Sequence, residues 1–507
     1  MSEQLALLPE YLTAHLQLTL VALLLSAATA LPLGIAATRS RWLEPVALGV
    51  AGVIQTVPGL ALLALMVPLL AAADLQSIGF LPAICGLTLY GVFPILRNTV
   101  TGISGVSPVY KEAARGVGMT PRQQLVRVEL PLAMPVIVAG LRTATVWLVG
   151  ITTLSTPVGA TSLGNYIFSG LQIRNYTAVV VGCVAAGGLA LLLDGLVRAV
   201  EDGLARRRRT QVTAALAIAA LLYGYAGVTL AARWSDPERP VVVGSKTFTE
   251  QYVLSAVIAN LIERETGRRT TLVQSLGSTV AFDALTADEI DIYVDYTGTV
   301  WVNHMEGGDT FPDRAVLTDS VRRFLHDRHG VALAAMLGFE NTYAVSVRGA
   351  DVERLGLRTI SDLAPVARQF VFGADYEFFA RPEWPAVRDA YGLAFRELRT
   401  MDPSLMYQAV AAGEVDVISG YGTDGRIDAY GLQALEDDRH AVPPYDAVVL
   451  AGAQLAREAP DVVAALGRLD GAIATDRMRA MNFEVDENGA DPSAVAARFV
   501  EGLLAAR

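Results

Sequence analysis

The chain carries no residue pattern that fits catalysis in solution. Gly244-Ser245-Lys246-Thr247 resembles the end of a phosphate-binding loop, but the earlier glycine and the Gly-Lys pair of that motif are missing. The segment from Gly420 to Gly425 matches G-x-G-x-x-G, yet it closes the α/β pattern of the chain, whereas a dinucleotide fingerprint opens one. The five histidines form no metal-ligand pattern, and no motif sets a nucleophile beside a base. We therefore expect no catalytic residue, no metal site and no cofactor.

Composition separates the chain into two parts of different character. Hydrophobic residues make up 52% of its 507 residues and the mean hydropathy is +0.40, and the apolar excess lies before residue 235. The net charge is +6 up to Arg233 and −17 after it. An acidic soluble part argues against nucleic acid, because phosphate contacts need clustered Lys and Arg. The two cysteines lie inside apolar runs and predict neither a disulfide nor a metal site.

Apolar runs long enough to cross a bilayer fill the first part. Positive charges follow the first, third and fifth runs, including Arg206–Arg209 after the fifth. Because cytoplasmic loops are rich in Lys and Arg, we expect each odd span to end in the cytoplasm and everything after about residue 232 to lie outside. The N-terminus lacks a basic n-region and a cleavage site, so we expect the first span to be retained. The six predicted spans are 15–37, 46–72, 78–96, 131–154, 177–198 and 212–231.

The loop between the third and fourth spans has the pattern of a docking element. Its sequence, SGVSPVYKEAARGVGMTPRQQLVRVELPLAMP, allows a short amphipathic helix, a glycine turn and a second short helix. Such a helix can lay its apolar side into a groove of another protein, although a loop lying on the membrane surface is the alternative. The residues that carry the pattern are Glu112, Ala113, Ala114, Gly118, Leu130 and Pro131.

This loop matches the EAA…G…LP signature and is similar to the coupling loop of ABC importer permeases. The resemblance implies that the groove belongs to a separate cytoplasmic ABC ATPase subunit, whose closure the loop transmits to the membrane helices. No ATPase motif occurs in this sequence, so we expect ATP hydrolysis in a partner protein and not in this chain.

Residues after 235 alternate short β-branched runs with helical stretches, which predicts an α/β fold with helices covering sheets. Within it, GSKTFTEQYVLSAVIANLIE, EIDIYVDYTGT and VISGYGTDGRI resemble the binding proteins of glycine betaine/carnitine/choline ABC importers. The similarity extends over nearly all of 240–507, and 10–205 is similar to the permease of the same systems. Ergothioneine importers of this family are also similar. The resemblance implies an all-α polytopic membrane domain of the type I importer class, followed by a two-lobed periplasmic-binding-protein fold.

We therefore expect a permease fused to its own binding protein. Residues 1–205 are expected to hold five transmembrane helices and the coupling loop, 206–235 a basic linker and the sixth helix, and 236–507 the binding domain. One lobe is placed at about 240–345 plus 446–507, and the other at about 346–445. Fusion raises the local concentration of binding domain at the permease mouth to roughly the millimolar range of short tethers.

The resemblance also implies a ligand site between the lobes. The aromatic cage of betaine-binding proteins falls on Tyr296, Tyr343, Tyr421 and Tyr445. A quaternary ammonium group has no hydrogen to donate, so electron-rich ring faces recognise it, each contributing roughly 0.5–2 kcal/mol. For each tyrosine taken alone, the alternative is an ordinary packing role at a strand end.

The same resemblance places Lys246, Thr299 and Arg381 around a ligand carboxylate, which Arg can bind through two hydrogen bonds. We expect the two cations to favour a zwitterion over choline, because choline would leave them buried and unpaired. Solvated surface charges are the alternative interpretation. Asp295 stands where relatives often have Glu, and Ser278 where many have Gly. Both differences lie near the cage and bear on which ligand substituent fits.

Together these features predict a homodimeric importer subunit in the inner membrane that takes up a quaternary ammonium zwitterion. Glycine betaine or proline betaine, as an osmoprotectant, is the leading cargo, and carnitine, choline and ergothioneine stay open because the sequence does not measure the cavity. A membrane receptor or ligand-gated channel is the alternative class. No output domain follows the cytoplasmic loops, and a channel needs no ATPase-docking loop. Hydrolysis of a betaine would require an activated nucleophile or water, which the cage does not offer.

Overall fold

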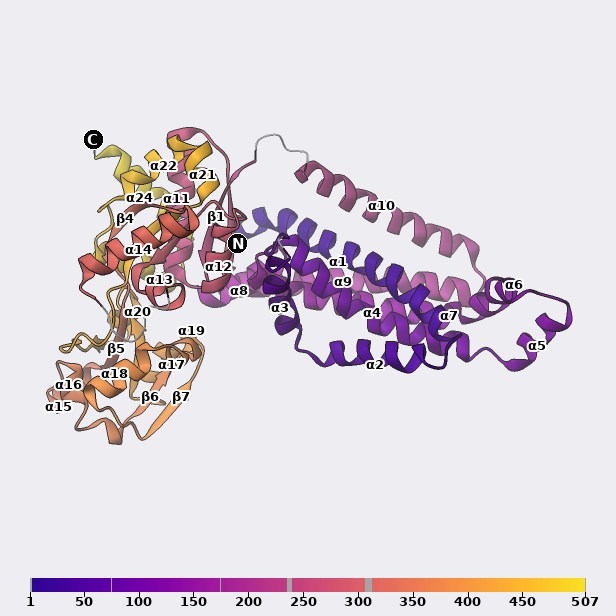
Figure 1. Ribbon diagram of the computed structural model, residues 1–507, viewed down its shortest axis with the longest axis horizontal. Coiled ribbons are helices and arrows are strands. Elements are labelled where there is room, and N and C mark those ends of the chain that lie inside the picture. The colour runs from indigo at the N-terminus through magenta and orange to yellow at the C-terminus, as the bar shows by residue number, and fades with distance from the viewer. Residues whose placement is uncertain (1, 74, 174, 235–238, 306–311, 507) are drawn as a thin grey trace. The chain divides into compact units, whose positions relative to one another are not determined.

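The computed structural model describes residues 2–73, 75–173, 175–234, 239–305 and 312–506 (Figure 1). The chain divides into two compact units, the first comprising residues 1–170 and 176–239 and the second comprising 171–175 and 240–507. The predicted start of the binding domain at residue 236 lies outside the described residues. In the described part of the chain, the first unit is helical and the second combines helices with two sheets.

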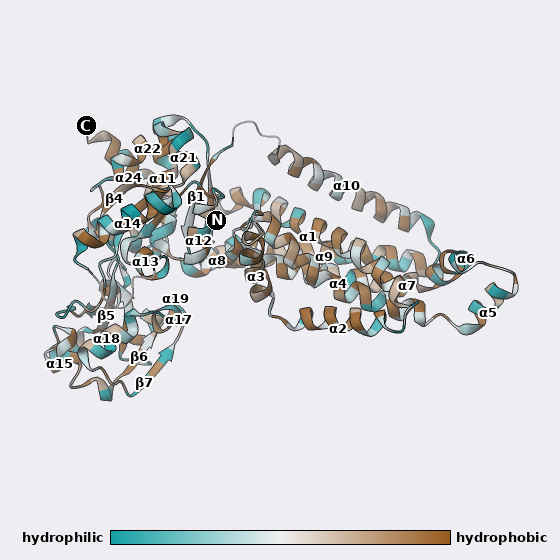
Figure 2. Ribbon diagram, in the orientation of Figure 1, coloured by the Kyte–Doolittle hydropathy of each residue, from teal (hydrophilic) through white to brown (hydrophobic). Residues whose placement is uncertain are grey.

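The helical unit carries long apolar helices, drawn mainly in brown in Figure 2. Among the described residues, five helices are long and apolar enough to cross a membrane, or six if the bent pair α2 and α3 is one span. The long helices and the bent pair coincide largely with the six predicted spans. The elements outside the coupling loop are α1 (Ser2–Ala37), α2 (Leu43–Thr56), α3 (Gly59–Ala71), α4 (Phe80–Ser104), α7 (Leu130–Thr152), η2 (Thr153–Val158), α8 (Gly164–Gln172), α9 (Tyr176–Ala205) and α10 (Arg209–Trp234).

One predicted span, 46–72, is not a single straight helix. It consists of α2 and α3, which meet at an angle of 103°. Val57 and Pro58 between them have extended backbone, with ψ of 129° and 135°. The proline ring crowds the residue before it and disfavours the helical conformation there, so α2 ends and the chain changes direction.

The coupling loop has the local structure that the sequence predicts. α5 (Pro108–Gly116) is followed by Gly118 with φ of +79°, a left-handed conformation that glycine adopts without a steric penalty. α6 (Pro121–Gln124) begins with a capping box between Thr120 and Gln123. A π-helical turn, η1 (Leu125–Glu129), then leads into α7.

The second unit contains two five-stranded mixed sheets, and we call the parts built on them the first lobe and the second lobe. Their strand orders are β2-β1-β3-β10-β4 and β7-β6-β8-β5-β9. The chain passes from the first sheet to the second between Glu340 and Tyr343, and it returns between Ala434 and Asp446. The strands are β1 (Val241–Lys246), β2 (Thr270–Leu276), β3 (Ile292–Tyr296), β4 (Ala332–Glu340), β5 (Tyr343–Arg348), β6 (Val371–Ala374), β7 (Glu397–Thr400), β8 (Val417–Tyr421), β9 (Leu432–Ala434) and β10 (Asp446–Ala451).

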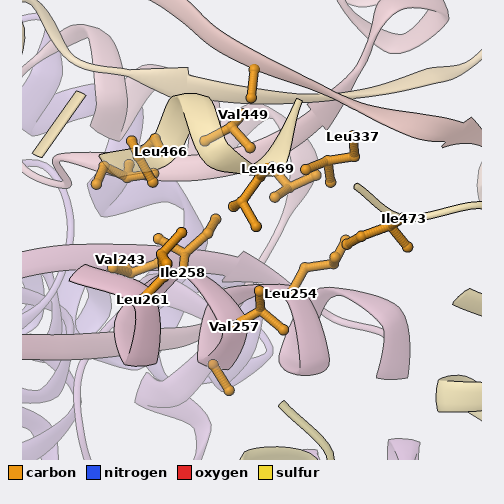
Figure 3. Packing of buried hydrophobic residues seen from close by; sticks show 14 of the residues in the cluster. Val243, Leu254, Val257, Ile258, Leu261, Leu337, Val449, Leu466, Leu469 and Ile473 are labelled. Carbon is orange, nitrogen blue, oxygen red and sulfur yellow. The ribbon is translucent and has the colours of Figure 1, made fainter. Parts of the chain in front are cut away.

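The first lobe has one apolar core between its sheet and its helices (Figure 3). Val243 of β1 and Val449 of β10 belong to it, together with Val257 and Leu261 of α11 (Thr249–Thr266) and Leu466 of α22. The burial of these side chains, at about 25 cal/mol per Å² of apolar surface, holds the strand ends of this lobe in place. The other helices of the lobe are α12 (Ser278–Thr286), α13 (Thr297–Asn303), α14 (Arg314–His329), α21 (Ala453–Glu458), α22 (Pro460–Leu466), η4 (Gly467–Leu469), α23 (Thr475–Asp486) and α24 (Pro492–Ala505).

Aromatic side chains fill the core of the second lobe. The ring of Phe372 lies 5.9 Å from Phe378, 5.3 Å from Trp384 and 4.8 Å from Phe395, measured between centroids. Phe378 is fully buried in α17 (Tyr376–Ala380), so this packing anchors the short helix to the core. The helices of the lobe are α15 (Gly349–Leu355), α16 (Ile360–Leu363), η3 (Ala367–Gln369), α17 (Tyr376–Ala380), α18 (Glu383–Tyr391), α19 (Pro403–Ala411) and α20 (Arg426–Ala429).

Candidate ligand-binding site

The strand topology brings the four predicted cage tyrosines together. β1 and β3 are parallel, so their last residues, Lys246 and Tyr296, lie at the same edge of the first sheet. β10 runs antiparallel to β3, which brings Tyr445, just before β10, to that edge. In the second sheet, Tyr343 at the start of β5 lies directly opposite Tyr421 at the end of β8.

These residues line one cavity of about 50 Å³, to which both lobes contribute. Thr299 reaches it from α13, and Arg381 from the residue directly after α17. The structure therefore places every residue of the predicted cage and carboxylate clamp at a single site. Four further residues complete the lining: Phe248, Ser278, Asn341 and Glu377.

Five aromatic rings form a continuous series around the cavity. The ring centroid of Phe248 lies 6.3 Å from Tyr296 and 6.1 Å from Tyr421, to which it is nearly parallel at 4°. Tyr343 lies 5.4 Å from Tyr421 and 5.9 Å from Tyr445. Sequence reasoning missed Phe248, and the only available signal was its place in the motif GSKTF. Ring faces at these separations suit a cationic headgroup that has no hydrogen to donate.

A buried carboxylate, Glu250, ties the cage to both lobes. It accepts hydrogen bonds from the Tyr296 hydroxyl and the Thr423 hydroxyl, both at 2.5 Å, from Asn341 Nδ2 at 3.1 Å and from Asn482 Nδ2 at 3.3 Å. Burial raises the pKa of Glu250, and these hydrogen bonds oppose that rise. Tyr296 ends β3 of the first sheet and Thr423 follows β8 of the second, so one carboxylate bridges the lobes. Sequence reasoning missed Glu250, because no local pattern marks a hydrogen-bond partner so distant in the chain.

Carboxylates also hold two other cage tyrosines. The Tyr421 hydroxyl donates to Asp375 at 3.1 Å, and the Tyr445 hydroxyl donates to Glu383, which is fully buried. Burial raises the pKa of both phenols well above the ordinary value, so they remain neutral donors. These hydrogen bonds restrict the orientation of the Tyr421 and Tyr445 rings.

Both predicted carboxylate-binding cations already have protein partners. The Lys246 side chain is 4% exposed, and its Nζ lies 2.5 Å from Asp295 Oδ1. The Arg381 side chain is 11% exposed, contacts Glu377 and lies 3.9 Å from Glu383. The expectation that a ligand without a carboxylate would leave these cations unpaired is therefore wrong. In the folded chain, Asp295 pairs with Lys246 and Glu377 pairs with Arg381, and sequence reasoning assigned neither acid to these cations.

The predicted coupling residues lie in the helical unit and form part of an exposed element. Glu112 and Ala113 are exposed on α5, whereas Ala114 is buried, and Leu130 and Pro131 begin α7. Apolar side chains stand out from this segment, with Val109 68%, Tyr110 56% and Val117 74% exposed.

Buried Glu129 connects the coupling loop with the end of α1. It accepts a hydrogen bond from Gln124 at 2.6 Å and pairs with Arg39, two residues after α1. The π-helical turn between the loop and α7 is thereby held to a second membrane helix.

Comparisons with known proteins give the same division of the chain. Residues 239–502 match the substrate binding domain of the ABC-type glycine betaine transport system, and 30–206 match the binding-protein-dependent transport system inner membrane component. The ergothioneine transport permease/ergothioneine binding protein EgtU of Helicobacter pylori is 30% identical over 468 residues, which is 90% of this chain and 83% of that protein.

Two relatives each match one part of the chain. The carnitine transport binding protein OpuCC of Listeria monocytogenes is 32% identical over 263 residues, 51% of this chain and 85% of that protein. The choline transport system permease protein OpuBB of Bacillus subtilis is 42% identical over 187 residues, 37% of this chain and 83% of that protein. These relatives are transport proteins, and the predicted order of a helical membrane domain followed by an α/β binding domain is confirmed. The chain belongs to the family of osmoprotectant and ergothioneine ABC importers, as a membrane permease fused to its substrate-binding domain.

Proposed function

We propose that this protein imports a trimethylammonium zwitterion, with glycine betaine or proline betaine as the leading cargo. The observation that carries the proposal is the series of five aromatic rings around the cavity. Each ring face that meets the headgroup contributes roughly 0.5–2 kcal/mol.

Arg381 is the proposed partner of the ligand's carboxylate. Its guanidinium lines the cavity and can form two parallel hydrogen bonds with a carboxylate, and the Thr299 hydroxyl supplies a further donor. Carnitine and ergothioneine, which the names of two relatives mention, share the trimethylammonium and carboxylate groups of the smaller betaines but are larger. They are the larger members of the same ligand class.

Choline is the second candidate, and the charge pairing of the site favours it. Lys246 and Arg381 have carboxylate partners in the protein, so a ligand without a carboxylate leaves neither cation unpaired. The name of one relative includes choline.

We further propose that two copies form the transport pathway, with the binding domain on the extracytoplasmic side and a separate ATPase below. The excess of Lys and Arg after the odd spans supports this orientation. The exposed apolar side chains of Val109, Tyr110 and Val117 suit a helix that docks into a groove on the ATPase. Ligand closes the two lobes, and closure of the ATPase is transmitted through the segment from Glu112 to Gly118.

Calorimetric titration of the full-length chain in lipid nanodiscs tests the cargo. The ligands are glycine betaine, proline betaine, carnitine, ergothioneine and choline. Tyr343→Leu removes one ring and is expected to weaken binding of the cargo by roughly 2- to 30-fold, whereas Tyr343→Phe keeps the ring and is expected to bind like the wild type. Failure of all five compounds to bind the wild-type chain would contradict the proposed function.

A further inference from the structure

Glu377 is a carboxylate built into the wall of the cavity. It lies in α17, four residues before Arg381, and its Oε1 contacts Nη2 of that arginine. The two side chains differ in exposure, with 41% for Glu377 and 11% for Arg381. The buried cation therefore has one partner that can turn toward water.

The backbone beneath this pair is anchored, so only the Glu377 side chain has to move. Asp375 caps α17 by accepting a hydrogen bond from the Phe378 amide at 2.7 Å, and the Phe378 side chain is fully buried. A change of the Glu377 rotamer breaks one ion pair and exposes the carboxylate to solvent, without displacing Arg381.

The other two acids near the cations are held in place. Asp295 and Glu383 are fully buried; Asp295 pairs with Lys246, and Glu383 accepts the Tyr445 hydroxyl. With Glu377 in place, Lys246 and Arg381 have Asp295, Glu377 and Glu383 as nearby acids, so a ligand without a carboxylate requires no rearrangement of these side chains. A zwitterion brings a further carboxylate, which can take the place of Glu377 on Arg381 only when Glu377 has turned away.

We propose that Glu377 competes with the ligand's carboxylate for Arg381 and thereby sets the relative affinity for zwitterionic and cationic trimethylammonium ligands. This inference rests on the proposed function. Glu377 is a specificity-determining residue: it fills the place of the carboxylate when choline is bound and turns away when a betaine is bound.

The test compares glycine betaine with choline. Glycine betaine has a carboxylate where choline has a hydroxymethyl group. Both are titrated calorimetrically against the full-length chain in nanodiscs. In Glu377→Gln, glycine betaine is expected to bind more tightly and choline more weakly, because Arg381 loses its competing partner. We expect the ratio of the two Kd values to change by about tenfold or more, as for loss of a charge-assisted hydrogen bond. Glu397→Gln is the matched control, since Glu397 forms an exposed pair with Arg399 in the same lobe, outside the cavity lining.

A double-variant cycle excludes a general structural effect. In an Arg381→Gln background, adding Glu377→Gln is expected to leave the ratio unchanged, because the shared partner is gone. An unchanged ratio in Glu377→Gln alone, or a parallel change in both affinities, would overturn the inference while the proposed function stands. If the wild-type chain binds only one of the two ligands, the direction of that ligand's change decides. Binding of neither ligand, nor of any other trimethylammonium compound, would overturn both.

Discussion

The buried ion pair between Lys246 and Asp295 is expected to show strongly non-additive losses of stability. The two side chains are 4% and 0% exposed. Asp295 also accepts the Tyr293 hydroxyl at 2.5 Å and the Tyr296 amide at 2.7 Å. The aspartate thus has three hydrogen-bond donors. Within the described part of the chain, the Lys246 ammonium pairs with this carboxylate and lies 5.9 Å and 5.5 Å from the ring centroids of Tyr293 and Tyr296.

These contacts give an ordered set of magnitudes. Asp295→Asn leaves a buried ammonium group without a counter-charge and is expected to lower the free energy of unfolding by about 3–5 kcal/mol. Lys246→Met leaves Asp295 with two donors, so we expect a smaller loss of about 1–3 kcal/mol. The double variant removes both charges, and methionine can pack against the ring of Tyr296. We therefore expect it to be more stable than Asp295→Asn by at least about 2 kcal/mol.

Urea unfolding of the fragment 240–507, followed through the fluorescence of Trp301 and Trp384, measures these differences. About half of this chain matches a carnitine binding protein of the family over 85% of that protein's length. We therefore choose the fragment 240–507 for the unfolding measurement. Simple addition of the two single losses in the double variant would show that the Lys246–Asp295 pair is not coupled. Binding supplies a second readout. A glycine betaine Kd within about threefold of wild type in the double variant would show that the pair is structural, whereas a loss of about 100-fold would assign Lys246 to the ligand's carboxylate.

Three further predictions follow from the same contacts. A glutamine at position 250 has one oxygen in place of two, so Glu250→Gln is expected to lower the free energy of unfolding of the fragment 240–507 by about 1–3 kcal/mol in urea. Loss of the bridge to Thr423 is also expected to weaken ligand binding in the titrations used for the cargo. Unchanged stability and binding would contradict the bridging role. Burial raises the pKa of Asp486 from 3.8 to about 7, so this group destabilises the folded state progressively as the pH rises from about 4 to about 7. Asp486→Asn is therefore expected to raise the free energy of unfolding at pH 8 and to change it little at pH 4, and an equal effect at both pH values would contradict this. Gly118→Ala places a side chain at φ of +79°, which is expected to cost about 1–2 kcal/mol of local conformational free energy. This variant is expected to reduce ATP-dependent uptake in proteoliposomes while ligand binding is unchanged. The control Gly116→Ala, where no atom lies within 4 Å of the added Cβ, is expected to transport normally.

Local patterns in the sequence were sufficient to predict the long apolar helices of the first unit, the α/β class of the second unit and the helix, glycine turn and second helix of the coupling loop. Each of these depends on local properties: the length of an apolar run, the alternation of β-branched residues, and a glycine that can adopt positive φ. Even the bend between α2 and α3 has a local cause in Pro58, although its angle of 103° does not follow from the sequence. The resemblance to betaine-binding proteins predicted seven site residues, and the folded chain places all seven at one cavity.

The pairing of the charges at that site depends on the tertiary structure. Lys246 meets Asp295 across 49 residues because β1 and β3 are neighbours in the first sheet. Glu250 meets Thr423 across 173 residues, where the two lobes come together. Local sequence patterns do not encode such pairings, because sheet order and strand register set the hydrogen-bond partner of a buried charge. A shift of one residue in the register of a strand would turn every side chain of that strand to the other face of the sheet. Glu377 and Arg381 stand at a helical spacing of four, yet that spacing does not reveal that both side chains face a ligand cavity. The sequence predicted which groups recognise a trimethylammonium ligand, and the fold shows that Lys246 and Arg381 already have carboxylate partners in the protein.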